Sequence, residues 1–127
     1  NAADIFAATG TPVLAATSGT VVISSNEEPG GASHVAIKGD DGNVYFYQHM
    51  GSGTITVARD AHVNAGDKIG EVGNRSDAFE TDTHLHFDVQ PPPATTRESC
   101  SREECADPSF TFINVQPALI RAFEGLP

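Results

Sequence analysis

The stretch Thr83-His84-Leu85-His86-Phe87-Asp88-Val89 decides the fold class. Polar and apolar residues alternate along it, and successive side chains of a β-strand point to opposite faces of the sheet. Leu85, Phe87 and Val89 would then face a core, while the two histidines share the opposite face. The stretch therefore predicts a β-strand that is apolar and buried on one side.

His84 and His86 would lie side by side on the polar face of this strand. A neutral imidazole is a preferred zinc ligand, so the pair could begin a metal site. An isolated His-x-His is also compatible with two surface histidines on an edge strand, because short motifs match often by chance. Both interpretations stay open on this stretch alone.

The composition points to one all-β domain. The chain has 127 residues, 12 glycines and 8 prolines, with several runs rich in Val, Ile and Thr, which is typical of short strands joined by tight turns. Further strands are expected at residues 13–16, 19–24, 34–38, 44–50, 54–57, 61–63 and 68–73. An Asp-Gly hairpin turn is expected at residues 39–43, and a short C-terminal helix at residues 117–123.

The charge and hydropathy of the chain argue against a nucleic-acid partner and against a membrane-spanning segment. The net charge is −10, which argues against nucleic acid, since that binding depends on Lys and Arg at the phosphates. No run approaches the roughly 20 apolar residues that cross a bilayer, so no membrane span is expected. The sequence begins abruptly at Asn1 and is expected to be a fragment or a mature form.

The expected organisation is a single domain of residues 1–127. Its core would cover residues 4–89, followed by a loop excursion at residues 90–107 and a C-terminal segment at 108–127. Cys100 and Cys105 fall in the excursion. A local disulfide, which would imply an oxidising compartment, and two unpaired surface thiols are both compatible with their spacing.

Four blocks of the chain, in order, resemble the lysostaphin/LytM-type zinc metalloendopeptidases. They are Asp4-Ile5-Phe6-Ala7 with Gly10-Thr11-Pro12-Val13 and Gly19-Thr20-Val21, then Tyr47-Gln48-His49-Met50, then the run from Val63 to Gly73, and His84-Leu85-His86-Phe87-Asp88-Val89. Each block alone is a weak signal, but their joint order is specific. The resemblance spans most of the chain.

The resemblance implies a mainly antiparallel, sandwich-like β-fold of the duplicated hybrid motif type, with the site in a groove over the sheet. It implies a Zn²⁺ ion held by Asp4 and His86. It implies that His49 and His84 bind and polarise the attacking water and stabilise the transition state. The substrate would be stem or cross-bridge peptides of bacterial peptidoglycan, and the location extracellular, periplasmic or in the cell envelope.

Two departures from the family pattern bear on these expectations. The first zinc ligand, a His four residues before Asp4, would lie directly before Asn1, and we expect the gene to encode a His there. The loop at residues 74–83 is longer and more acidic than is usual in the family. The alternative is a catalytically silent domain of the same fold, which regulates another wall hydrolase or binds wall peptides.

Other polar residues are expected to have ordinary roles. His34 and His62 are expected to be solvated, and the acidic residues of the loop at 74–83 are expected to form a solvated surface. Tyr45 and Tyr47 would share a strand face with His49, as a groove wall, a hydrogen-bond donor to a reaction intermediate, or ordinary sheet packing.

Overall fold

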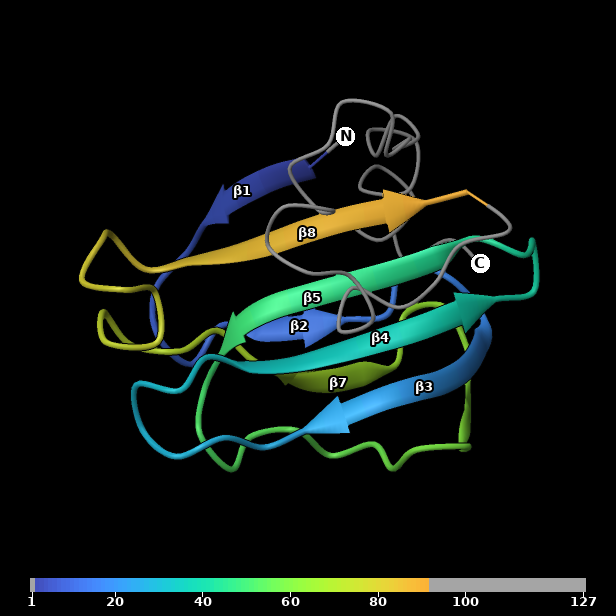
Figure 1. Cartoon of the computed structure of the whole chain (residues 1–127), viewed down its shortest axis with the longest axis horizontal. Coiled ribbons are helices and arrows are strands. Elements are labelled where there is room, and N and C mark those ends of the chain that lie inside the picture. The colour runs from blue at the N-terminus through green and yellow to red at the C-terminus, as the bar shows by residue number, and fades with distance from the viewer. Residues whose placement is uncertain (1, 92–127) are drawn as a thin grey trace, which may run out of the picture.

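The computed structural model describes residues 2–91, which form eight β-strands (Figure 1). The strands are β1 (Ala2–Phe6), β2 (Pro12–Leu14), β3 (Gly19–Ser25), β4 (Ser33–Gly39), β5 (Val44–Met50), β6 (His62–Val63), β7 (Lys68–Glu71) and β8 (His84–Gln90). The predicted all-β class is confirmed. No helix in this part of the chain is long and apolar enough to cross a membrane.

Several predictions concern residues outside the described range. They are the C-terminal helix at 117–123, the pairing of Cys100 with Cys105, and the division of the chain after residue 91. All three stay predictions.

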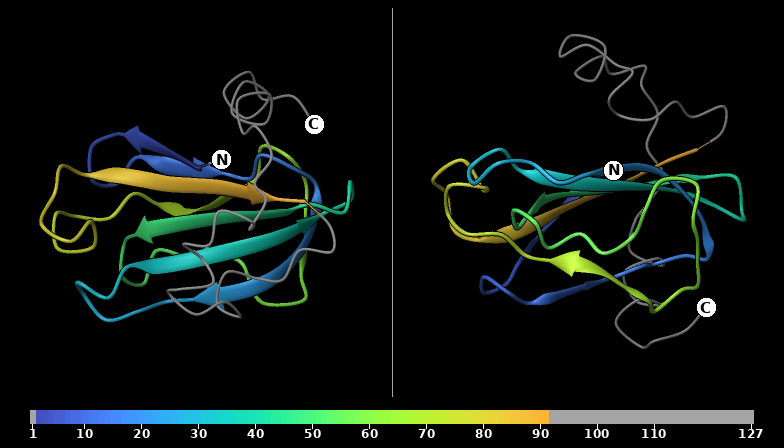
Figure 2. Two further views of the ribbon diagram at one scale, coloured as in Figure 1. Left: turned by 45° about the horizontal axis from the view of Figure 1, so that its top comes forward. Right: turned by 90° about the horizontal axis from the view of Figure 1, so that it is seen from below.

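The strands form two antiparallel sheets in two layers. The larger sheet has six strands in the order β1-β8-β5-β4-β3-β6, and β2 pairs with β7 in a second sheet. The small sheet lies behind the large one in Figure 1, and the right-hand view of Figure 2 shows the two layers edge-on. One face of the large sheet is thus covered by the small sheet.

The core lies between these two layers. Val13 and Ile69 enter it from the small sheet, and the apolar side chains of β8 enter it from the large sheet. Phe87 is fully buried, with its ring centroid 5.1 Å from that of Tyr47 and 6.3 Å from that of Tyr45. The alternation predicted for β8 is therefore present.

The two tyrosines pack in this core and do not line the site. Tyr47 is buried, and its hydroxyl accepts a hydrogen bond from the backbone N–H of Ala16 at 2.8 Å. Burial raises the pKa of Tyr47, so the phenol stays protonated. Of the alternatives left open by the sequence, ordinary sheet packing is therefore the one observed.

The hairpin between β4 and β5 follows its Asp-Gly sequence. Gly42 has a φ of 88°, and its N–H donates to the carbonyl of Gly39 at 2.9 Å. The Asp41 carboxylate accepts hydrogen bonds from the N–H of Asn43 at 2.9 Å and from the hydroxyl of Tyr45 at 2.5 Å. Glycine supplies the left-handed backbone, and Asp41 holds the turn together.

The strand expected at residues 54–57 is not formed. The N–H of Ile55 donates to the side-chain oxygen of Asn26 at 3.2 Å, where a strand would use a neighbouring carbonyl. The N–H of Thr56 reaches the carbonyl of Ile69 at 3.2 Å. A single backbone hydrogen bond does not form the repeated pairing of a β-strand. The β-branched composition of the segment therefore predicted a strand that is not formed.

The core packing predicts a large penalty for truncating Phe87. Phe87→Ala should lower the free energy of unfolding by about 3–5 kcal/mol, because it removes a fully buried ring between two tyrosines. Leu14→Ala, at a side chain that is 37 % exposed, should cost less than about 1 kcal/mol. Urea unfolding of both variants measures the difference, and similar losses would contradict this assignment of the core.

Candidate functional site

The pairing of β1 with β8 brings the first two predicted site residues together. Asp4 lies directly opposite His86, and Phe6 lies opposite His84. The neighbouring residues Ile5 and Leu85 belong to the core, so Asp4 and His86 project from the other face of the sheet. The site therefore forms on the face that the small sheet does not cover.

Asp4 is close to both histidines of the motif. Its Oδ1 lies 3.4 Å from Nδ1 of His86 and 3.8 Å from Nε2 of His84. The side chain of Asp4 is half exposed, and that of His86 is mostly buried. These separations are longer than those of good hydrogen bonds. Asp4, His84 and His86 therefore lie around a common space without bonding directly to one another.

Asp88 fixes the orientation of His86. Nε2 of His86 is 3.0 Å from Oδ2 of Asp88, whose side chain is completely buried. A carboxylate accepts hydrogen bonds, so Nε2 carries the proton and Nδ1 presents its lone pair towards Asp4. The imidazole is thereby held in the tautomer that a metal ligand at Nδ1 requires.

His84 is held in the opposite tautomer. Its Nδ1 donates to the backbone carbonyl of Asp82 at 2.7 Å, which leaves Nε2 unprotonated in the neutral ring. The ring is buried, and its centroid is 4.7 Å from that of His49. The two imidazoles therefore form a contacting pair beside Asp4.

His49 reaches this pair because the end of β5 departs from a regular strand. Its φ is 68°, a left-handed conformation that His adopts more readily than most residues. Its Nδ1 donates to the carbonyl of Asp77 at 2.8 Å, so its Nε2 is also unprotonated. Burial lowers the pKa of His49, although the Asp77 carbonyl opposes this, so the ring is neutral at neutral pH.

Asp77 is the anchor of the loop at residues 74–83, and it corrects the expectation that this acidic residue is solvated. It is buried, and its carboxylate accepts the N–H of Gly30 and that of Asn74, both at 3.1 Å. The same residue presents the carbonyl that holds His49. Glu80 and the Asp82 side chain are exposed, as expected.

The remaining histidines lie apart from the site. His62 is exposed on β6, at the far edge of the large sheet, which confirms the expectation for it. His34, on β4, is half-buried and its ring centroid lies 5.7 Å from that of Phe46 on β5, so it is less solvated than expected.

The predicted ligands fit a zinc ion as part of its ligand set. Within residues 2–91 no three His, Cys, Asp or Glu side chains are arranged to hold a metal. Asp4 and His86 do offer an oxygen and an unprotonated nitrogen 3.4 Å apart. Two ligands bound at about 2.0 Å to a tetrahedral zinc lie about 3.3 Å apart, so this pair can supply two of the ligands.

Two residues that orient the site histidines, Asp88 and Asp77, were not singled out from the sequence. Asp88 could have been found, because it follows His86 by two residues and so shares its strand face. Asp77 carried no such signal, since nothing in a polar loop marks one carboxylate as buried.

The Asp77 anchor predicts a change in His49 that can be seen spectroscopically. Asp77→Ala removes the acceptor of two backbone N–H groups and should lower the free energy of unfolding by about 1–3 kcal/mol. The backbone carbonyl of residue 77 remains in this variant, but the carboxylate that holds it in position is lost, so His49 should populate both neutral tautomers. Long-range ¹H–¹⁵N correlation of the imidazole nitrogens measures this.

Asp67→Ala, which removes an exposed turn carboxylate bonded to the N–H of Asn64, is the control and should leave His49 unchanged. A single Nδ1-protonated His49 in Asp77→Ala would contradict the assignment.

Comparison with known proteins identifies the family. The model of Peptidase family M23 matches residues 1–98. The catalytic domain of the antimicrobial peptidase lysostaphin from Staphylococcus simulans is 27% identical, with a TM-score of 0.65, and the match covers 92% of this chain and 76% of that one. A mutant catalytic domain of the prophage-encoded M23 protein EnpA from Enterococcus faecalis is also 27% identical, with a TM-score of 0.60 and coverage of 87% and 72%. LytU, at 24% identity, shares the fold, with a TM-score of 0.68 and coverage of 97% and 76%. Since the family match spans most of the sequence, this chain belongs to Peptidase family M23.

Proposed function

We propose that the protein is a zinc-dependent endopeptidase that hydrolyses the peptide cross-links of bacterial peptidoglycan. The observation that carries this proposal is the convergence of Asp4, His86, His84 and His49 on one space at the face of the large sheet that the small sheet does not cover. Membership of a peptidase family and the likeness to lysostaphin support it.

Asp4 and His86 would hold the zinc ion. The carboxylate oxygen and Nδ1 of the imidazole are suitable ligands, and the buried Asp88 keeps His86 oriented as a second-sphere carboxylate does. The third ligand in this proposal is the His that the family motif places directly before Asn1. When bound, zinc polarises a carbonyl oxygen and lowers the pKa of water towards about 7.

His49 and His84 would handle the protons. Each ring has its Nδ1–H committed to a backbone carbonyl, so each presents an unprotonated Nε2. Such a nitrogen can take the proton of the attacking water and return it to the leaving amine. Because burial lowers the pKa of His49, that ring is ready to accept a proton at neutral pH.

The substrate also fixes where the protein would act. Peptidoglycan peptides lie outside the cytoplasmic membrane, so the proposed location is extracellular, periplasmic or in the cell envelope. The acidic chain, with a net charge of −10, is not suited to a nucleic-acid partner.

The first prediction from this proposal separates the metal ligands from the proton-handling residues. The prediction concerns a longer chain in which a His, the proposed third ligand, directly precedes Asn1. Asp4→Ala and His86→Ala should each abolish stoichiometric zinc binding, because each removes a ligand. His49→Ala and His84→Ala should retain zinc, as should His62→Ala, a control at an exposed histidine far from the site. Metal content measured by mass spectrometry decides this, and zinc loss in His49→Ala or His84→Ala would make that histidine a ligand.

The second prediction concerns turnover. His49→Ala and His84→Ala should each reduce hydrolysis of a peptidoglycan cross-link peptide by about 10²–10⁴, the usual contribution of a general acid–base group. Chelation should abolish activity, and added zinc should restore it. A zinc-loaded wild-type chain that binds the peptide and leaves it intact would favour the silent, peptide-binding alternative.

A further inference from the structure

Two exposed phenylalanines flank the histidine pair. Within residues 2–91 three large hydrophobic side chains are exposed: Phe6 at 67%, Phe79 at 64% and Leu14 at 37%. The two most exposed of these both contact a site histidine. The ring of Phe6 lies 5.5 Å from that of His84, and the ring of Phe79 meets His49 edge-on at 5.1 Å.

Backbone contacts fix the positions of both residues. Phe6 ends β1 opposite His84, and the next residue is tied to Thr83 by two hydrogen bonds. In these bonds the N–H of Ala7 donates to the carbonyl of Thr83 at 3.2 Å, and the hydroxyl of Thr83 donates to the carbonyl of Ala7 at 2.6 Å. Phe79 has a φ of 54°, an unusual backbone conformation for a bulky residue. The loop that imposes it is anchored at Asp77.

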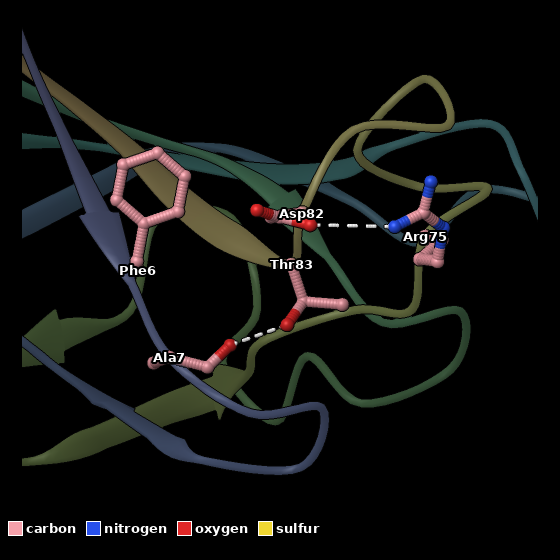
Figure 3. Close-up of a pocket in the computed structure, with 5 residues that line it drawn as sticks. All are labelled: Phe6, Ala7, Arg75, Asp82 and Thr83. Carbon is pink, nitrogen blue, oxygen red and sulfur yellow. Dashed lines mark hydrogen bonds and ion pairs between the residues drawn. The ribbon is translucent and has the colours of Figure 1, made fainter.

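A cavity lies at the surface beside the side chain of Phe6 (Figure 3). It is open to solvent, has a volume of about 410 Å³ and is lined by Phe6, Ala7, Arg75, Asp82 and Thr83, while Phe79 lies outside it. Thr83 directly precedes His84 in the chain, so the cavity adjoins the proton-handling pair. A peptide held at the histidines would have its neighbouring residues against these walls.

The charges in the cavity balance each other. Nη1 of Arg75 is 3.3 Å from Oδ1 of Asp82, and Nη2 of Arg75 donates to the carbonyl of Glu80 at 2.7 Å. Figure 3 shows the Asp82 carboxylate between the Phe6 ring and the guanidinium. A charged substrate side chain would therefore meet an ion pair, Arg75 with Asp82, whose charges already neutralise each other. The apolar ring of Phe6 is then the feature of the cavity that distinguishes one substrate side chain from another.

We propose that Phe6, beside His84, and Phe79, beside His49, form two apolar walls of the peptide site, which selects peptides with an apolar side chain, of the alanyl type, over glycyl peptides beside the cleaved bond. This inference rests on the proposed function, because it takes the ligand to be a peptide. A glycyl residue offers no side chain to these rings. Each methyl group buried against them should improve recognition about fourfold.

The test uses two peptides that differ only at the residues on either side of the cleaved bond, which are Ala in one and Gly in the other. The zinc-loaded longer chain should cleave the alanyl peptide with a kcat/KM at least about fourfold higher. Phe6→Ala and Phe79→Ala should each bring this ratio closer to one, while Phe6→Leu, which keeps an apolar wall, should retain most of it. Leu14→Ala, the third exposed hydrophobic residue, is the control and should keep the wild-type ratio. A wild-type ratio of one or less, or a ratio that neither Phe→Ala variant changes, would overturn the proposal.

A binding measurement separates this inference from the proposed function. The metal-free wild-type chain is titrated with the same two peptides and followed by NMR chemical-shift changes. Tighter binding of the alanyl peptide, with shifts at Phe6 and Phe79, supports the subsite even if the zinc-loaded chain cleaves neither peptide. Equal affinities for the two peptides overturn the subsite whether or not the chain is an active peptidase.

Discussion

The register between β1 and β8 is the constraint on which the site depends. Asp4 faces His86 only because the two strands pair with these residues directly opposite. A slip of one residue would turn Asp4 into the core and expose Ile5 in its place, since side chains alternate along a strand. The apolar faces of both strands oppose such a slip, as do the two hydrogen bonds between Ala7 and Thr83. Core packing and site geometry therefore depend on the same strand register.

The three imidazoles are oriented by acceptors that lie outside the space they share. His86 donates to the Asp88 carboxylate, His84 to the carbonyl of Asp82, and His49 to that of Asp77. In its neutral form, each ring thus has its N–H committed to an acceptor and its other nitrogen available as a ligand or base. Burying a carboxylate is expensive unless it is hydrogen-bonded, which makes the fully buried Asp88 hard to explain as packing alone. Its contact with His86 gives it a role in orienting that ring.

Local periodicity predicted most of the strands and the pair formed by His84 and His86, because alternation depends only on neighbours in the sequence. It failed where the decisive contact is distant in the chain. The segment at 54–57 has strand composition, but Ile55 bonds to the side chain of Asn26. The face assigned to His49 was wrong for a related reason. A φ of 68° turns this residue away from the face that Tyr47 occupies, and no rule of alternation contains that turn. The ligand assignments came from resemblance to a family, and spacing alone did not select Asp4.

The loop at residues 74–83 breaks several local rules at once. It holds Phe79 and Glu80 in consecutive left-handed conformations, which are uncommon for residues other than glycine, and it exposes a large aromatic ring. Strain of this kind persists only where surrounding contacts impose it. Here the buried Asp77 anchors the loop through its two backbone donors, and Arg75 bonds to both the N–H and the carbonyl of Glu80, each at 2.7 Å. The same anchor supplies the carbonyl that orients His49. Because one residue fixes both His49 and the loop that carries Phe79, a change in this loop alters the orientation of the histidine and the position of the exposed ring together.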